Sequence, residues 1–453
     1  MKRTLCFLIA AAVGLGLLGG CTPEPPTPNE TVTVVDAEGN RLASFDRLDG
    51  MAEGVREPAL LCYVQIAVNE AITYLMTADG LDQTAAAKAL FAKPHTLHTA
   101  MQQTAYESMV DGMESAEQKA TYAAAATDLH GKLIAAVSGG DATRNNYAFQ
   151  KTAPYSAFKP LSLYAPAIEQ GRICWSTVYF DGPVKQVTDE TGRTTPWPAN
   201  ATNSYAQRNI PVAEAIAQSL NTVAVRCLQE IGVNETIRYT EQTFGLSLQA
   251  EKNRAMMLGE DEVLGNIALG YLEEGISPVE MAGYYQIFAT GGRYTAPQAL
   301  QKLTVGEETV YTYRPETKAI ISESTADVMN RMLQEVVSVR GTAAAAAIDG
   351  VAVGGKSGTG TDNVGNWFVG FTPEYCCAVW RGAEVTRNDT AGLFSAIVGG
   401  FPLDKTAAYP PCRNVRRQAF CRSSGLLMGA NCTDVDLGWF DVDHTPAVCD
   451  KCE

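Results

Sequence analysis

The pair Ser156 and Lys159, followed by the apolar segment 161–171, constrains the fold of this chain more than any other sequence feature. The apolar run predicts a helix that begins at Ser156, and a spacing of three places both side chains on one face. The start of a helix leaves backbone N–H groups free beside the serine. Burial would lower the pKa of the lysine, so that it could accept a proton from the serine hydroxyl. A capping serine with a solvated lysine would give the same short pattern, so the pair needs support from elsewhere.

A second polar motif, Ser219-Leu220-Asn221, follows a helical stretch opened by Pro211. A hydroxyl and an amide two residues apart can relay a proton and hold a substrate amide. The plain structural interpretation is a polar break between two helices.

A third motif, Lys356-Ser357-Gly358-Thr359, precedes the aromatic strand 366–371, which contains Trp367. A lysine and hydroxyls along a strand edge suit a substrate carboxylate. Gly358 has no side chain, so we expect the backbone of a substrate to lie close to it. A glycine-rich hairpin without function would have the same composition.

Residues 350–357 (GVAVGGKS) also fit the phosphate-binding loop of nucleotide hydrolases. Such a loop must lead into a helix, whereas here a predicted strand follows, so we expect no nucleotide site. The four histidines form no metal motif, and no Gly-x-Ser-x-Gly sequence occurs. We therefore expect neither a metal nor a cofactor.

The N-terminus predicts export from the cytoplasm. Lys2 and Arg3 precede an apolar run over 5–18, and the sequence Leu-Gly-Gly-Cys ends at Cys21. We interpret 1–21 as a signal peptide with a bacterial lipobox, in which Cys21 is lipidated, and 22–31 as a proline-rich tether. An uncleaved membrane anchor is the alternative. Either way the chain would be extracytoplasmic and anchored to the cell membrane.

The chain has twelve cysteines, of which Cys6 and Cys21 lie in the leader. Ten remain, an even number in an exported chain, so we favour disulfides over zinc. Cys449 and Cys452 form the single Cys-x-x-Cys, and the other spacings are irregular for a zinc site. Five cysteines crowd the end of the chain: Cys412, Cys421, Cys432, Cys449 and Cys452.

The 453 residues carry a formal net charge of −15, which makes nucleic acid an unsuitable partner. Alternating residues over 32–45 predict a β-hairpin, and 58–92 and 99–113 predict helices, with Asp82 capping one of them. A two-stranded ribbon is expected over 120–137, with its turn at Asp128 to Gly131.

The three motifs, in this order, resemble those of penicillin-recognising serine enzymes, and the match over about residues 94–400 resembles penicillin-binding transpeptidase domains. The resemblance extends to the ribbon at 128–137 and to segments 214–232, 275–297, 336–342 and 355–375, while 422–432 and 445–449 look like the cysteine-bearing tails of some bifunctional relatives.

The resemblance implies the α/β (α+β) fold that these transpeptidases share with serine β-lactamases. That fold has a central antiparallel sheet with flanking helices and an all-α lobe. We divide the remaining chain into a small N-terminal region (32–93), a transpeptidase domain (94–405) and a Cys-rich tail (406–453).

The resemblance also implies a D,D-transpeptidase that acts on peptidoglycan stem peptides ending in D-Ala-D-Ala and is acylated by β-lactams. Ser156 would be the nucleophile and Lys159 its base, and backbone N–H groups of Ser156 and Thr359 would form the oxyanion hole. Ser219, Asn221 and Lys356 would complete the catalytic set. Substrate binding would fall to Ser357, Gly358, Thr359 and Trp367.

Two departures qualify the resemblance. Tyr155 stands before the nucleophile where the family usually has glycine, and its bulk could narrow the entrance. The segment 56–75 faintly resembles the start of a glycosyltransferase domain, but about eighty residues before Ser156 are too few for one. We expect no glycan polymerisation and a separate glycosyltransferase as partner. The alternatives are a D,D-carboxypeptidase, a β-lactamase and a non-enzymatic β-lactam sensor or scaffold.

Overall fold

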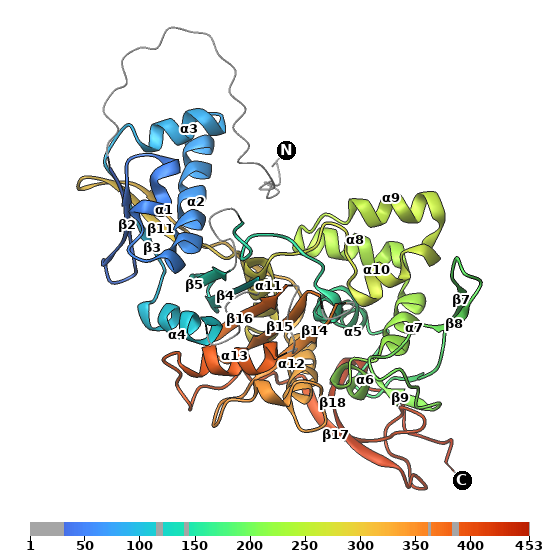
Figure 1. Ribbon diagram of the computed structural model, residues 1–453. Helices are drawn as coiled ribbons and strands as arrows, with labels where there is room; N and C mark the ends of the chain where they lie inside the picture. The colour runs from blue at the N-terminus through green and yellow to red at the C-terminus, as the bar shows by residue number, and fades with distance from the viewer. Residues whose placement is uncertain (1–30, 115–120, 140–144, 361–363, 383–388, 453) are drawn as a thin grey trace.

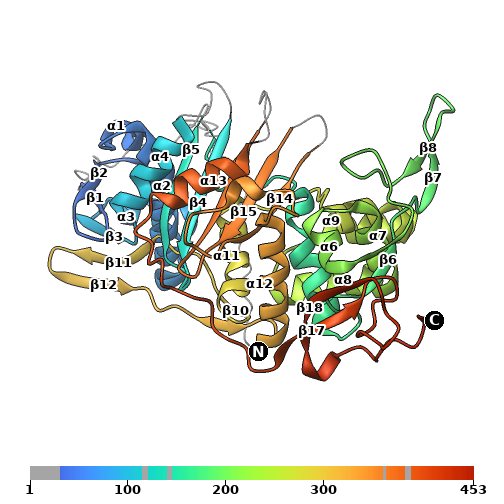
Figure 2. The ribbon, with the colours of Figure 1, turned by 90° about the horizontal axis from the view of Figure 1, so that it is seen from below.

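The computed structural model describes residues 31–114, 121–139, 145–360, 364–382 and 389–452. The expected leader, with Cys21, and nearly all of the tether lie outside these residues. A central sheet separates an N-terminal unit from an all-α lobe, and the C-terminal residues lie below that lobe (Figures 1 and 2).

The central sheet is antiparallel throughout, in the order β14-β15-β16-β4-β5. Alternation along β15 points Phe368 at Phe394 of α13 and Phe371 at Phe288 of α11, which places these helices on opposite faces. The sheet and its helices are β14 (Gly354–Gly358), β15 (Asn366–Phe371), β16 (Tyr375–Arg381), β4 (Tyr122–Asp128), β5 (Leu133–Gly139), α4 (Gln103–Glu114), α11 (Pro278–Ala289), α12 (Glu323–Val337) and α13 (Thr390–Gly399).

The ribbon expected over 120–137 forms β4 and β5 of this sheet, as predicted. The helix expected from Thr99 begins only at Gln103, because Thr99 ends β3 and its hydroxyl donates to Val35 O at 2.8 Å.

The N-terminal unit is a second five-stranded sheet, in the order β12-β11-β3-β1-β2. The predicted hairpin at 32–45 is present, and Asp82 caps α3 by accepting from Ala85 N at 2.8 Å. Because β11 and β12 come from far along the chain, the expected boundary at residue 93 runs through this unit. Its elements are β1 (Val32–Val35), β2 (Arg41–Phe45), η1 (Leu48–Gly50), α1 (Met51–Gly54), η2 (Pro58–Leu60), α2 (Leu61–Asp79), α3 (Gln83–Leu90), β3 (His95–Thr99), β11 (Leu300–Val305) and β12 (Glu308–Thr312).

The helix over Pro58–Asp79 is long and apolar enough to cross a membrane, but 61% of its most apolar window is buried inside the protein. Glu70 on α2 accepts hydrogen bonds from Ala299 N and Leu300 N at 3.1 and 2.6 Å, which fixes α2 against β11. We therefore interpret α2 as the core helix of the N-terminal unit.

The all-α lobe follows the nucleophile segment. Its elements are α5 (Ala165–Glu169), α6 (Val212–Ala217), α7 (Asn221–Ile231), α8 (Val233–Phe244), α9 (Gln249–Leu258), η5 (Glu260–Glu262) and α10 (Leu264–Leu269). The two-stranded sheets pair β6 (Val178–Phe180) with β9 (Asn209–Pro211), β7 (Lys185–Thr188) with β8 (Thr194–Trp197), and β10 (Arg293–Thr295) with β13 (Thr317–Ala319).

The C-terminal tail forms the hairpin of β17 (Val415–Cys421) and β18 (Val435–Asp441), followed by η8 (Val442–His444). The hairpin packs on α12, where the Arg331 guanidinium lies 3.5 Å from the ring centroid of Trp439. The disulfides expected from the sequence are absent, since all ten cysteines of the described residues are free thiols. The short η6 (Ala344–Ala346) precedes β14.

Candidate active site

The first motif lies at the start of a helical segment, as predicted. Ser156 is half-buried in the 3-10 turn η3 (Tyr155–Ala157), which leads into the wide-turn helix η4 (Pro160–Tyr164) and then α5. The hydroxyl of Tyr285 on α11 donates to Ala157 O at 2.5 Å and fixes the turn from below. This anchor was not visible in the sequence, because Tyr285 lies in an ordinary apolar helix.

Lys159 is almost fully buried, at 1% exposure. Its ammonium donates to Asn221 Oδ1 at 2.7 Å and to Ser219 O at 3.2 Å. Burial, together with the nearby charge of Lys356, lowers the pKa of Lys159 well below its usual value. A lysine whose neutral form is favoured in this way is suited to accept the proton of a nearby hydroxyl.

The second motif forms the connection between α6 and α7. Ser219 has a φ of 57°, a left-handed backbone conformation, and Asn221 begins α7. This bend points the Ser219 carbonyl oxygen at Lys159 and its hydroxyl at Lys356. The polar break between two helices is therefore real, and it is also the point at which the motifs meet.

A buried hydrogen-bond network holds the second motif in place. The carboxylate of Asp181 accepts from Asn200 Nδ2, Thr222 Oγ1 and Ala206 N at 2.8, 2.6 and 2.6 Å. Asn200 Oδ1 in turn accepts from Asn221 N at 2.9 Å. Sequence analysis missed Asp181 and Asn200, which stand in turn-rich segments that carry no motif.

The third motif lies on β14, the edge strand of the central sheet, as the sequence suggested. Lys356 is fully buried, and its ammonium donates to Ser219 Oγ at 2.8 Å and to Ser357 O at 3.0 Å. Burial lowers the pKa of Lys356 to about 7. Since the lysine is committed to Ser219 and the segment is a strand, a nucleotide phosphate has no place here.

The hydroxyl residues of the third motif are more accessible than its lysine. Ser357 is half-buried, with its Oγ 3.3 Å from Thr342 Oγ1, and Thr359 is exposed directly after the strand. Within the described residues, β15 is the only strand that pairs with β14. The opposite edge of β14 can therefore receive an extended peptide.

Two residues expected to contact substrate have another role. A side chain on Gly358 would collide with Pro154 O and Ala157 N, so this glycine lets the strand approach the nucleophile turn. Trp367 is fully buried and donates from Nε1 to Ala153 O at 2.9 Å. Both residues position the backbone around Ser156, and their direct binding of substrate stays a prediction.

Tyr155 has a φ of 48°, a conformation that favours glycine. Its N–H donates to Gly270 O at 3.0 Å, and its ring packs edge-on against Tyr271 with centroids 5.3 Å apart. The same ring lies close to Gly360 and Gly365, where any side chain would meet it. The bulk of Tyr155 therefore lies against Gly360 and Gly365, shortly after the third motif.

The arrangement as a whole brings the three motifs together through Ser219, which contacts both buried lysines. Ser156 and Lys159 share one helical turn, and Asn221 contacts Lys159. Among the described residues, no His, Asp, Glu or Cys side chain takes part in these contacts. The groups of this site suit attack by a serine hydroxyl on a carbonyl carbon.

The family model for the penicillin binding protein transpeptidase domain matches residues 122–392. Among curated proteins, penicillin-binding protein 1F of Bacillus subtilis is 31% identical over 308 residues, which cover 65% of this chain and 40% of that protein. Penicillin-binding protein 1A of Clostridium botulinum is 29% identical over 278 residues, which cover 59% of this chain and 32% of that protein. The chain thus spans about a third to two fifths of the length of these relatives.

Solved structures show the same fold. The D,D-transpeptidase domain of a peptidoglycan glycosyltransferase from Eggerthella lenta superposes with a TM-score of 0.63 at 19% identity, covering 83% of this chain and 98% of that one. Penicillin-binding protein A from M. tuberculosis, solved as an imipenem acyl-enzyme complex, also superposes with a TM-score of 0.63. Its sequence identity is 16%, and the match covers 82% of this chain and 99% of that one. The expected fold class is confirmed.

Proposed function

The chain belongs to the penicillin-binding protein transpeptidase family, and on this premise we propose that it is a serine D,D-transpeptidase that cross-links peptidoglycan stem peptides. The observation that carries the proposal is the convergence of two buried lysines on Ser219, with Lys159 one helical turn from Ser156. Burying two ammonium groups close together is costly, and a site for proton transfer explains why the fold tolerates it.

Acylation begins when Ser156 Oγ attacks the carbonyl carbon of the penultimate D-Ala and Lys159 takes the hydroxyl proton. Backbone N–H groups of Ser156 and Thr359 stabilise the oxyanion, each contributing roughly 3 kcal/mol to the transition state. Collapse of the intermediate breaks the D-Ala–D-Ala bond and leaves an ester on Ser156. The low pKa of Lys159 supports its role as base.

The leaving D-Ala needs a proton on its amine. Ser219 Oγ passes that proton from the lysine, a role supported by the hydrogen bond that it accepts from the Lys356 ammonium at 2.8 Å. Ser357 and Thr359 bind the terminal carboxylate along the open edge of β14, with the charge of Lys356 behind them. Asn221 holds the amide of the acyl peptide with the Nδ2 hydrogen that is not donated to Ala199 O.

The acceptor decides the product. The amine of a neighbouring stem peptide completes a cross-link, whereas water would make the protein a carboxypeptidase, or a β-lactamase when the acyl group is a β-lactam. β-Lactams acylate Ser156 because they imitate the D-Ala-D-Ala end. The proposed reaction uses no cofactor.

We also propose that the protein acts outside the cytoplasm, anchored to the membrane through the lipidated Cys21, and that a separate glycosyltransferase makes the glycan.

A β-lactam sensor without turnover is the second candidate, and Tyr155 is the observation that favours it. Its ring lies against Gly360 and Gly365 and its backbone is strained, which costs roughly 1–3 kcal/mol. If this side chain hinders stem peptides more than small β-lactams, acylation by penicillin would occur without release of D-Ala.

The test is to incubate the purified chain with fluorescent penicillin and follow its intact mass over time. We expect a stable adduct that is lost in Ser156→Ala and kept in Ser162→Ala, a matched change at a buried serine of the same helical segment. Release of D-Ala from a stem peptide then separates the enzyme from the sensor. A short-lived adduct would favour a β-lactamase, and a folded chain that forms no adduct would refute the proposal.

A further inference from the structure

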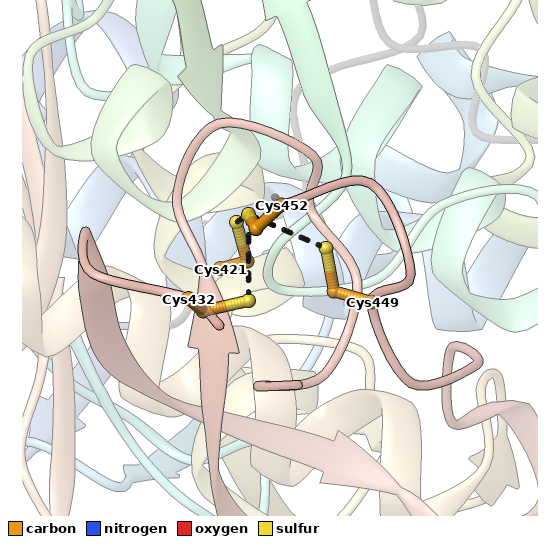
Figure 3. A group of neighbouring side chains, drawn as sticks. All are labelled: Cys421, Cys432, Cys449 and Cys452. Carbon is orange, nitrogen blue, oxygen red and sulfur yellow. Dashed lines mark hydrogen bonds between the residues drawn. The ribbon is translucent and has the colours of Figure 1, made fainter. Parts of the chain in front are cut away.

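Four cysteines of the C-terminal tail form a cluster outside the candidate active site. Cys421 ends β17, Cys432 lies in the loop 422–434, and Cys449 and Cys452 form the Cys-x-x-Cys at the end of the chain. All four Sγ atoms lie within 4.8 Å of one another (Figure 3). The cluster takes no part in the acyl-transfer site, so it needs its own explanation.

The distances between the sulfur atoms have the size expected around one metal ion. Cys452 Sγ lies 3.6 Å from Cys421 Sγ, 3.5 Å from Cys432 Sγ and 3.8 Å from Cys449 Sγ. Four sulfurs at about 2.3 Å from a tetrahedral zinc ion are separated by about 3.8 Å. A disulfide would require about 2.05 Å and would use only one of the three neighbours of Cys452.

We propose that Cys421, Cys432, Cys449 and Cys452 bind one Zn²⁺ as a closed, structural tetrathiolate site. The four thiols bind as thiolates and release their protons to solvent, so the site carries a net charge of −2. With four protein ligands, no coordination position remains for water or substrate, and the metal has no part in catalysis. This replaces the expectation of disulfides and of no metal.

Donors around the sulfurs fit thiolates. Gly429 N donates to Cys432 Sγ at 3.3 Å, and Ser424 Oγ donates to Cys449 Sγ at 3.2 Å. Ser423 Oγ lies 3.1 Å from Cys421 Sγ and can donate to it once the thiol has lost its proton. Such donors orient the ligands and offset the negative charge of a metal–thiolate centre.

The backbone already holds the ligand loops together. Leu427 N donates to Ala447 O and Cys449 N donates to Leu427 O, at 2.9 and 2.8 Å, which joins the last residues to the loop between β17 and β18. A side chain on Gly429 would collide with Cys449 O, so glycine is required for this approach. The cysteines on the two segments are thereby brought to one place before any metal binds.

The tail has little core of its own, which gives a metal a structural purpose. The apolar residues buried in the described part of 406–452 are few: Val415, Phe420, Cys421, Phe440 and Cys449. Small units with so little buried apolar surface are commonly stabilised by a metal or by disulfides.

The metal would also fix a contact to the second motif. Arg422, next to the ligand Cys421, pairs with Glu214 on α6 at 2.5 Å, and Ser176 Oγ donates to Gly425 O at 2.5 Å. Helix α6 ends just before Ser219. Zinc would therefore hold the loop that supports α6, and so act on Ser219 as a distant positioning element.

The experiment uses the full chain, purified without chelators, and measures metal by mass spectrometry and thiols by alkylation. We expect about one zinc per chain, with all four cysteines alkylated after denaturation in chelator without reductant. Cobalt should replace zinc and give the strong visible absorption of a tetrahedral Co²⁺–thiolate centre. Both metal readouts should be lost in Cys452→Ser and kept in Cys412→Ser, a half-buried cysteine of the same tail outside the cluster.

The wild-type measurements need no variant, so they hold even if Cys452→Ser fails to fold. Cysteines that react only after a reductant is added would show disulfides and overturn the proposal. Iron in place of zinc would overturn it, as would four free thiols that fail to take up zinc or cobalt. These outcomes do not depend on penicillin binding, so they are separate from those that test the proposed function.

Discussion

The three-motif site and the C-terminal cysteine cluster both gather reactive side chains from distant parts of the chain, but they are supported differently. In the first, Lys159 and Lys356 are buried against a helix junction and a sheet edge. In the second, four sulfurs meet where the end of β17, the loop after it and the last residues of the chain come together. Helices and strands with a large core can hold side chains whose charges repel. A segment with little core needs a bound ligand to hold its reactive side chains together.

The largest expected effect lies in the motif site, at Lys159. Lys159→Met keeps the buried stem but removes the base, so acylation by penicillin should slow roughly a thousandfold, or about 4 kcal/mol in activation free energy. Stopped-flow measurement with fluorescent penicillin gives the rate constant. Lys88→Met, at an exposed position of α3, is the control and should leave the rate unchanged.

If Lys159→Met acylates at the wild-type rate, the buried lysine is only structural. The motif site and the cysteine cluster would then differ in the elements that hold their side chains, but neither buried group would be shown to act in acyl transfer.

The second largest expected effect tests whether the hydrogen bonds of Asp181 hold the second motif in place. Asp181→Ala removes the acceptor of two buried donors and of the part-buried Ala206 N, so the free energy of unfolding should fall by about 3 kcal/mol and acylation should slow about tenfold. Denaturant unfolding and acylation rates measure the two effects. Asp189→Ala removes a carboxylate from an exposed turn and should cost less than about 0.5 kcal/mol. Equal losses of stability in Asp181→Ala and Asp189→Ala would show that the hydrogen bonds of Asp181 do not stabilise the second motif.

The burial of Lys356 predicts a dependence of stability on pH. With its pKa lowered to about 7 from the ordinary 10.5, the folded chain binds fewer protons than the unfolded chain between these values. The contribution of this group to stability is therefore fully present above pH 10.5 and is lost as pH falls toward 7. Over this range the free energy of unfolding should rise by about 1.4 kcal/mol per pH unit, or about 2 kcal/mol between pH 7.5 and 9.

The measurement compares wild type with Lys356→Met by unfolding at several pH values. Because methionine carries no proton, wild type should gain stability relative to the variant as pH rises through this window. A difference that stays constant with pH would show that Lys356 keeps its charge when buried.

The smallest expected effect lies at the link between the two regions. Arg422 pairs with Glu214 of α6 and with Asp436 of β18 at 2.5 and 2.8 Å. Arg422→Ala should lower the free energy of unfolding by about 1 kcal/mol and slow acylation by no more than a few fold. Arg340→Ala, which loses only an exposed contact to the same Asp436 at 3.8 Å, should have no measurable effect. An Arg422→Ala loss as large as that of Lys159→Met would show that the tail belongs to the catalytic machinery.

The sequence alone determined the local features. The Ser156–Lys159 spacing predicted a shared helical turn, the aromatic run after Lys356 predicted a strand, and Asp82 predicted a helix start, because each follows from chain geometry within a few residues. The order of the three motifs then pointed to the family, which the comparisons established.

Only the tertiary structure decided which residues from distant parts of the chain are in contact. It showed that Ser219 contacts both lysines, that Gly358 and Trp367 support the nucleophile turn, and that Asp181 holds Asn200, which in turn holds Asn221. It also brought four irregularly spaced cysteines together, where the spacing had favoured disulfides. Contacts between residues tens to hundreds of positions apart depend on how the sheet, the lobe and the tail pack, and no local pattern encodes that packing.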